Sequence, residues 1–187
     1  MNFIELPLPG AYIMELAPQR DSRGWFARTF DQEIFQRIGH TRSFVQFNHS
    51  ASTFQGTLRG LHYQLPPHGE AKLVRCIRGA VYDVIVDLRK GSPAFLRHVS
   101  IELSEENLRA LYIPEGFAHG FQTLSDQTQL IYHHTGYYHP ASERGLRYND
   151  PRLGIQWPLE PTAVSEKDQT YPWLEADFAG VVVANGQ

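Results

Sequence analysis

The sequence predicts an all-β fold, a sandwich or barrel built from about ten short strands. Three observations lead to this prediction. Short apolar or alternating segments follow one another from residue 11 to residue 134, glycine and proline separate most of them, and only one segment carries convincing helix signals. A length of 187 residues fits one domain. We therefore expect residues 1–187 to form a single domain with an irregular tail from about residue 140.

The N-terminal part combines strands with the one helix. Asp21–Gly24 is a turn by composition. Asp31 is a suitable N-cap for a short helix through about Ile38, and Gly39 would end it. Strands are expected where apolar and aromatic residues gather, at 11–16, 25–30 and 43–48.

The central part reads as a succession of strands separated by glycine and proline. The segment 80–88, AVYDVIVDL, is nearly all apolar, as expected for a strand that is buried on both faces. The tail after Pro140 is irregular, and a short helix is possible near Ser165–Asp168. The other strands are expected at 57–64, 73–78, 98–103, 110–113, 117–124 and 128–134.

Composition limits the classes of partner. The formal charge of -3 provides no broad positive field for nucleic acid or an anionic membrane. The first residues lack the basic start and long apolar run of a secretion signal, and no apolar stretch approaches a membrane helix in length. We therefore expect a cytoplasmic protein. Cys76 is the only cysteine, so an internal disulfide is impossible, and its apolar strand predicts a core position.

The segment 56–72, GTLRGLHYQLPPHGEAK, is the most informative stretch. With a strand period of two, Arg59 and Leu61 are expected on one face and Gly60 and His62 on the other. Glycine has no side chain, so a bulky group could approach beside His62. The prolines of LPPHG then end the strand.

A hairpin over this segment would bring His62 close to Lys72. A histidine could remove a proton near neutral pH, and a lysine could stabilise a developing negative charge. The alternative is a surface strand with ordinary polar residues.

A second informative segment is Pro114–Gly120, PEGFAHG. It is similar to the PxGxxH segment that supplies one metal ligand in cupin barrels, where an HxH segment supplies two more. Here His62-Tyr63-Gln64 stands in place of HxH, and an amide is a poor ligand for Zn²⁺ or Fe²⁺. We therefore expect a cupin-type jelly-roll barrel without a working metal site. A metal-dependent cupin is the alternative.

An ordered set of motifs extends this comparison to nearly the whole chain, about residues 10–174. Together they resemble the dTDP-4-dehydrorhamnose 3,5-epimerase family of sugar-nucleotide enzymes. The resemblance implies a cofactor-independent isomerase that inverts C3 and C5 of a nucleotide-linked 4-keto-6-deoxy sugar, working as a homodimer. The motifs are RGLHYQ, AKLVRCIRG, VYDVIVDLRKGSP, YIPEGFAHGF, the segment 132–138, NDP at 149–151, the WP at Trp157 and SEKD at 165–168.

The resemblance also implies catalytic roles for four residues. RGLH aligns His62 with the family's base, and SEKD aligns Asp168 with its carboxylate partner. Tyr132, in LIYHH, falls at the position of the acid, and Lys72, in AKLV, at that of the family's lysine.

A further group of residues is implied in substrate binding. Arg59 matches a diphosphate-binding arginine, and Tyr138 matches a tyrosine near the nucleotide base. Arg23 and Phe26, in DSRGWF, match residues that the partner subunit of the dimer delivers. The remaining candidates for this group are Gln46, Asn48, His119 and Glu143.

Two positions depart from the family pattern. Arg28 stands where a glutamate near the nucleobase is often found, which leaves the base preference open. Phe47 stands where an acidic residue is frequent, so a more apolar pocket wall is expected. Inside the family, the alternative is an enzyme acting at C3 or C5 alone. Outside it, the alternatives are a metal-dependent cupin and a sugar-nucleotide-binding protein without catalysis.

Overall fold

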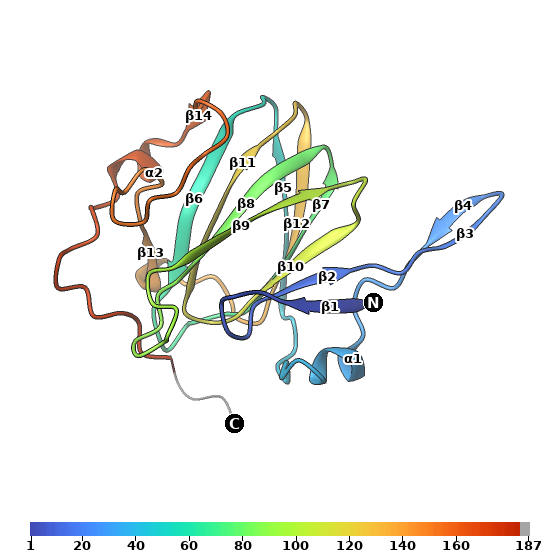
Figure 1. Ribbon diagram of the computed structural model, residues 1–187, viewed down its shortest axis with the longest axis horizontal. Helices are drawn as coiled ribbons and strands as arrows, with labels where there is room; N and C mark the ends of the chain where they lie inside the picture. The colour runs from blue at the N-terminus through green and yellow to red at the C-terminus, as the bar shows by residue number, and fades with distance from the viewer. Residues whose placement is uncertain (184–187) are drawn as a thin grey trace.

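In the computed structural model, which describes residues 1–183, two antiparallel sheets pack face to face (Figure 1). This architecture confirms the predicted all-β jelly roll, although residues 184–187 of the expected domain lie outside the described part. The first sheet has the order β1 (Asn2–Glu5), β2 (Tyr12–Glu15), β10 (Arg109–Ile113), β7 (Lys72–Arg78), β12 (Thr128–His134) and β5 (Gln46–Ser52). The second has the order β13 (Glu143–Gly145), β6 (Thr57–Gln64), β11 (Phe117–Thr123), β8 (Ala80–Asp87) and β9 (His98–Ser104), and β14 (Ala163–Val164) pairs with β6 in parallel.

Apolar side chains form three layers around these sheets. The central layer lies between them and contains Cys76, which is fully buried as expected. A second layer covers the outer face of the second sheet, where residues of the C-terminal tail pack on β6, β8 and β11. A third layer covers part of the outer face of the first sheet, where Phe35 is fully buried against β2, β7 and β10.

The helix α1 (Gln32–Gln36) carries Phe35 and begins as predicted. The carboxylate of Asp31 accepts hydrogen bonds from the backbone N–H groups of Glu33 and Ile34, at 3.1 and 3.3 Å. The helix ends before the expected Ile38, because the N–H groups of residues 37–39 bond carbonyls three residues back.

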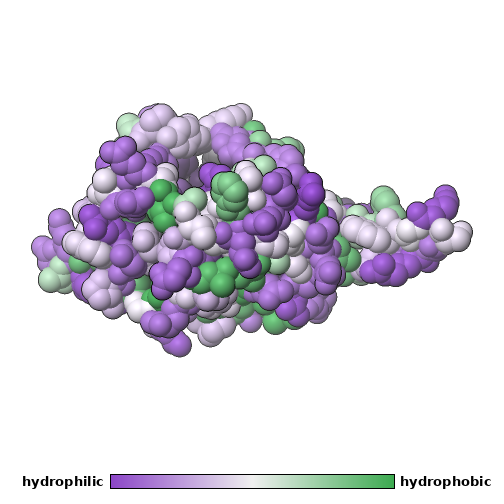
Figure 2. Space-filling model, turned by 90° about the horizontal axis from the view of Figure 1, so that it is seen from above, coloured by the Kyte–Doolittle hydropathy of each residue, from purple (hydrophilic) through white to green (hydrophobic). Residues whose placement is uncertain are grey.

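The segment 25–30 was expected to be one strand, and only its beginning is. β3 (Gln19–Asp21) and β4 (Gly24–Phe26) form a two-stranded hairpin, and the turn predicted at 21–24 joins them. The hairpin stands away from the body of the molecule, as Figures 1 and 2 show. Its Trp25 and Phe26 are exposed.

The other expected strands are present, with shifted ends where pairing decides the bounds. β5 runs from 46 to 52 instead of 43 to 48, because it pairs with the whole of β12. In the tail, the expected short helix is α2 (Glu166–Thr170), preceded by the 3₁₀ turn η1 (Pro140–Ser142). No helix within residues 1–183 is long and apolar enough to span a membrane.

Candidate active site

The strand β6 contains an irregularity that places Arg59 and His62 on the same face. On β11, His119 is opposite His62 and Phe121 is opposite Arg59, so two residues of β6 face one residue of β11. This bulge interrupts the period of two. The expectation that Arg59 and His62 lie on opposite faces is therefore wrong.

Gly60, inside the bulge, serves a different purpose from the one expected. A Cβ atom there would lie 2.6 Å from the Cα of Gly120 and 2.8 Å from the carbonyl oxygen of His119. The space beside Gly60 is thus occupied by the backbone of β11. The expectation that a bulky ligand group could approach there is therefore wrong.

One end of the sandwich contains a cavity of about 690 Å³ between the two sheets. Both sheets and the C-terminal tail contribute to its walls. All four predicted catalytic residues line it, although they come from four separate elements. They are His62 on β6, Lys72 on β7, Tyr132 on β12 and Asp168 on α2. The polar residues of its lining are Asn48, His49, Ser50, Thr57, Arg59, His62, Lys72, His119, Tyr132, His134, Ser165, Lys167 and Asp168.

His62 and Asp168 form a close pair in this cavity. The His62 Nε2 and Asp168 Oδ1 atoms lie 2.6 Å apart, and the aspartate side chain is 5% exposed. The backbone N–H of Gly60 donates to the other carboxylate oxygen at 3.2 Å. Ser165 caps α2 by accepting a hydrogen bond from the backbone N–H of Asp168, at 3.1 Å. This contact fixes the backbone position of Asp168.

The pKa of Asp168 reflects two opposing effects. Burial raises it, but the hydrogen bonds from His62 and Gly60 outweigh burial and hold the pKa below its ordinary value. The carboxylate therefore stays ionised and can support a positive charge on the imidazole.

Tyr132 reaches the cavity from β12, in the sheet opposite to that of His62. Its hydroxyl lies 2.9 Å from Ser50 Oγ on the neighbouring β5. Burial raises the pKa of the Tyr132 phenol well above its ordinary value, so the hydroxyl keeps its proton at neutral pH.

His119 faces the cavity with a partner that the sequence reasoning missed. Its Nε2 lies 2.9 and 3.0 Å from the two carboxylate oxygens of Asp83, a fully buried residue of β8. Burial raises the pKa of Asp83, and contact with His119 opposes this rise. A signal was present, because Asp83 is a charged residue in the middle of a mostly apolar strand, where an unpaired carboxylate would be costly.

Lys72 lies beside two further residues that the sequence reasoning missed. Its Nζ is 3.4 Å from Glu70 Oε1, and His134 Nδ1 is 2.9 Å from Glu70 Oε2. All three side chains are largely buried.

A second cavity of about 380 Å³ continues from the first and shares Asn48, His62, Lys72 and His134 with it. The predicted residues Gln46, Tyr138 and Glu143 line this part. Glu143 Oε2 accepts hydrogen bonds from the Tyr138 hydroxyl at 2.7 Å and from Lys167 Nζ at 2.5 Å.

Two predicted binding residues lie elsewhere. Arg23 and Phe26 are in the projecting hairpin, and neither lines the cavity of its own chain. Arg23 forms an ion pair with Asp21 at 2.6 Å, and Phe26 is 71% exposed. Arg59, by contrast, lines the cavity, where Ser52 Oγ accepts a hydrogen bond from its Nε at 3.2 Å.

Comparison with known proteins shows which family has a similar sequence. Residues 5–176 match the family described as dTDP-4-dehydrorhamnose 3,5-epimerase. A relative of that name from Shigella flexneri is 45% identical over 180 residues, which cover 95% of this chain and 99% of the relative. One from Escherichia coli K12 is 46% identical over 171 residues, covering 90% of this chain and 92% of the relative.

The chain belongs to the dTDP-4-dehydrorhamnose 3,5-epimerase family. It is an isomerase that epimerises a nucleotide-linked 4-keto-6-deoxy sugar.

Solved structures of the family agree with this assignment. The enzyme from Bacillus anthracis, with TDP and PPi bound, superposes with a TM-score of 0.90 at 41% identity, covering 92% of this chain and 99% of that one. The enzyme from Legionella pneumophila, in complex with dTDP-4-keto-L-rhamnose, also gives a TM-score of 0.90 at 41% identity, covering 98% and 99%.

Gln64, which replaces a metal-binding histidine of metal cupins, has a structural task in this epimerase. Its Nε2 donates to the carbonyls of His68 and Tyr137, and its Oε1 accepts from the N–H of His139. Both ends of the amide are thereby used. In the part of the chain that the structure describes, no cluster of three or more His, Cys, Asp or Glu residues is arranged to hold a metal ion.

The two departures from the epimerase family pattern lie outside the cavity of this chain. Phe47 points to the outer face of β5 and packs edge-on against His133 at 4.7 Å between ring centroids. It is 68% exposed, so the expected apolar pocket wall is not formed within the chain. Arg28 forms an ion pair with Asp31 at 2.6 Å, beside α1.

Proposed function

We propose that the enzyme inverts C3 and C5 of dTDP-4-dehydro-6-deoxyglucose with His62 as base, Tyr132 as acid and Lys72 as the cation that stabilises the enolate. The observation that carries this proposal is the 2.6 Å pair of His62 and Asp168 in a cavity that Tyr132 enters from the opposite sheet. Two proton-transfer groups on opposite walls are what inversion at a planar carbon requires.

The first step removes a proton from carbon next to the C4 ketone. Such a proton is weakly acidic because its loss gives an enolate, whose negative charge resides largely on oxygen. The second ring nitrogen of His62, Nδ1, accepts the proton, and ionised Asp168 stabilises the resulting imidazolium through Nε2. Lys72 provides a buried positive charge for the enolate oxygen.

The second step returns a proton to the other face. The Tyr132 hydroxyl remains protonated at neutral pH, so it can donate that proton. Carbon thus loses one proton and gains another, and the reaction needs neither an oxidant nor a cofactor. We expect chelators to leave the activity unchanged, because the amide of Gln64 is used to hold the loop 137–139.

The remaining lining residues suggest how the substrate is held. We assign Arg59 to the diphosphate, because its guanidinium carries the charge and donors that phosphate oxygens need. His119, held by Asp83, is assigned to the sugar. The second cavity is assigned to the nucleoside, with Tyr138 stacking on the base and Gln46, Asn48 and Glu143 providing polar contacts.

The proposed active unit is a homodimer. A two-stranded hairpin with exposed Trp25 and Phe26 is a poor structure to leave in solvent by itself. In a dimer, this hairpin would bring Arg23 and Phe26 to the cavity of the other subunit. A cytoplasmic location also remains a proposal, and the free thiol of Cys76 is compatible with a reducing compartment.

The test is NMR spectroscopy of dTDP-4-keto-6-deoxyglucose with the enzyme in D₂O. Deuterium should enter at C3 and C5, and the 3,5-inverted product should form. A specific alternative exists, because a 3'-monoepimerase from Streptomyces bikiniensis, solved with dTDP-quinovose, is 38% identical with a TM-score of 0.84, covering 90% of this chain and 85% of that one. Exchange and inversion confined to C3 would favour that activity. Absence of exchange at both carbons would contradict the proposal.

A further inference from the structure

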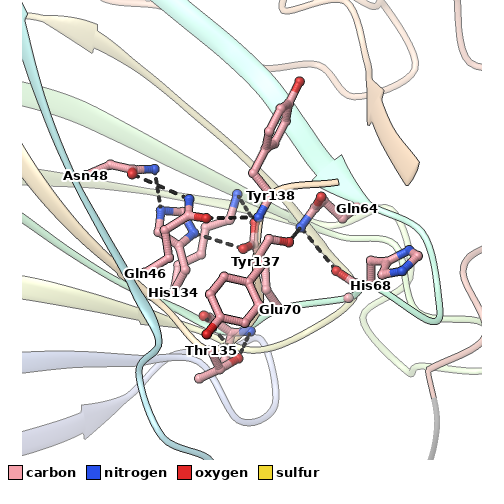
Figure 3. Close-up of polar contacts among 12 residues, drawn as sticks. Gln46, Asn48, Gln64, His68, Glu70, His134, Thr135, Tyr137 and Tyr138 are labelled. Atoms are coloured by element: carbon pink, nitrogen blue, oxygen red, sulfur yellow. Dashed lines mark hydrogen bonds and ion pairs between the residues drawn. The ribbon is translucent and has the colours of Figure 1, made fainter. Parts of the chain in front are cut away.

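A continuous chain of hydrogen bonds, ending in one ion pair, connects the loop that carries Tyr138 to the ammonium group of Lys72. Figure 3 shows the part of it from Tyr138 to Glu70. The chain of hydrogen bonds passes through four side chains from three different segments, namely β5, β12 and the loop before β7. Its members, in order, are the backbone N–H of Tyr138, then Gln46, Asn48, His134, Glu70 and finally Lys72.

The donor and acceptor of each hydrogen bond in this series follow from the contact at Tyr138. A backbone N–H can only donate, so the atom that faces it, at 2.9 Å, must be the oxygen of the Gln46 amide. The NH₂ group of Gln46 then faces Asn48, whose Oδ1 accepts at 3.4 Å. The NH₂ group of Asn48 is left facing His134.

This order of donors and acceptors determines the state of His134. Its Nε2, 3.3 Å from Asn48 Nδ2, must be the acceptor, so the proton of the neutral ring is on Nδ1. The Nδ1–H group donates to Glu70 Oε2 at 2.9 Å. His134 therefore accepts a hydrogen bond from Asn48 and donates one to Glu70.

Glu70 connects this chain of hydrogen bonds to Lys72, the proposed catalytic lysine. One of its oxygens accepts a hydrogen bond from His134, and the other forms an ion pair with Lys72 Nζ at 3.4 Å. Burial raises the pKa of Glu70, but its contacts with His134 and Lys72 outweigh burial and lower it, so the side chain is a carboxylate. The backbone beside it is held as well, since the N–H of Ala71 donates to Thr135 Oγ1 at 2.8 Å.

The other side of the same loop is held independently. Gln64 Nε2 donates to the Tyr137 carbonyl (Figure 3). Its Oε1 accepts from the N–H of His139, so both neighbours of Tyr138 are held. The position of the Tyr138 N–H is therefore set by two amides, and only the one from Gln46 leads on to Lys72.

We propose that His134 and Glu70 are positioning residues, which hold the Lys72 ammonium for the enolate oxygen and link its position to that of the nucleoside-side residue Asn48. This inference rests on the proposed function, because it takes Lys72 as the group that stabilises the enolate. Neither His134 nor Glu70 needs to contact the reacting atoms. His134 fixes which way the Glu70 carboxylate faces, and the carboxylate fixes the ammonium.

Two substitutions separate the two halves of the link. His134→Asn keeps an N–H donor near the position of Nδ1 but provides no acceptor for Asn48. It should weaken dTDP binding, measured by calorimetry, and lower kcat much less than a substitution that removes both hydrogen bonds. Glu70→Gln provides one acceptor where two donors need one, so it should lower kcat on the order of tenfold, with dTDP affinity retained.

A double-mutant cycle tests whether the effect passes through Lys72. His134→Leu removes both hydrogen bonds and should lower kcat for deuterium uptake on the order of tenfold to a hundredfold. In the Lys72→Met background the same substitution should have little further effect on kcat, because the group that it positions is absent. His98→Leu, on β9 outside both cavities, is the matched control and should leave kcat unchanged. Thermal unfolding checks that each variant folds.

The outcomes are distinct. Equal losses of kcat from His134→Leu with and without Lys72 would mean a merely structural role and would overturn the proposal. So would a loss of kcat in His134→Asn as large as that in His134→Leu. If His134→Leu does not fold, His134→Asn and Glu70→Gln still decide the matter. Lack of exchange by the wild type would instead contradict the proposed function, while the dTDP-binding measurements would still test the link to Asn48.

Discussion

His62 Nε2 and Asp168 Oδ1 lie 2.6 Å apart although 106 positions separate the two residues in the chain. The second oxygen of Asp168 is occupied by the N–H of Gly60. The carboxylate thus has two contacts with β6. Because an ionised carboxylate can only accept, a neutral His62 ring carries its proton on Nε2 and has its free lone pair on Nδ1.

Asp168→Asn should therefore inactivate the enzyme without unfolding it. The amide oxygen can still accept from Gly60, so the NH₂ group would face His62 Nε2 and force the ring proton onto Nδ1. That nitrogen could no longer accept a proton from the substrate. We expect a loss of about 10²–10⁴-fold in kcat, measured by NMR, with an unchanged circular dichroism spectrum. Near-normal turnover would mean that His62 Nδ1 is not the base.

Tyr132→Phe should separate exchange from inversion. It keeps the ring that packs in the cavity and removes only the hydroxyl, so His62 can still form the enolate. Deuterium should continue to enter the substrate from the side of His62, while the inverted product falls sharply. His62→Ala, by contrast, should abolish both. Wild-type rates of inversion in Tyr132→Phe would show that another group or a water molecule is the acid.

Arg23→Ala should lower activity even though Arg23 lies outside the cavity of its own chain. Mixing this variant with His62→Ala distinguishes the two possible sources of the arginine. If it acts across the dimer, a hybrid has one site with an intact His62 and an intact Arg23 from the other subunit, and activity should recover. No recovery, under conditions where light scattering or native mass spectrometry shows exchange of subunits, would place its action within one chain.

Stability should fall as the pH is lowered below about 6.5, in part because of His40. This residue is buried among aromatic side chains beside Tyr112. Burial and, to a lesser degree, Arg42 lower its pKa from the ordinary 6.5. The unfolded chain therefore binds a proton before the folded one does, so the contribution is complete above pH 6.5 and is lost as pH falls toward the folded-state pKa.

His40→Asn should make that decline shallower. The measurement is urea unfolding at a series of pH values, and the quantity compared is the slope of the unfolding free energy against pH. His133, whose pKa is also lowered, chiefly by burial, should account for part of the slope that remains. An unchanged slope would show that His40 does not titrate in this range.

The sequence was sufficient for β2 and for β5 to β12, because alternation and breaks at glycine and proline are local signals, but β1, β3, β13 and β14 were not expected. Of the four proposed catalytic residues, only His62 and Lys72 were suggested by their own segment, and the roles of Tyr132 and Asp168 came from the family resemblance. Alternation located β6 to the residue, β12 was expected with the bounds that it has, and the Asp31 cap located α1. The cap at Ser165 was not foreseen, and only a short helix near it was expected. The predicted assignment of Arg59 and His62 to opposite faces of β6 was wrong, because a bulge depends on the partner strand and no local pattern indicated it. Glu70 and His134 were missed because neither is unusual in its own segment, and only the pairing of distant strands brings them together.

The location of Asp168 has a consequence for how the protein is made. The twelve strands β1 to β12 all precede residue 135, whereas the carboxylate that holds His62 comes from α2 near the end of the described chain. During synthesis on the ribosome, a nascent chain that has already paired β1 to β12 would still lack this carboxylate. On the proposed mechanism, a partly synthesised chain would have no activity until α2 has emerged and joined β6.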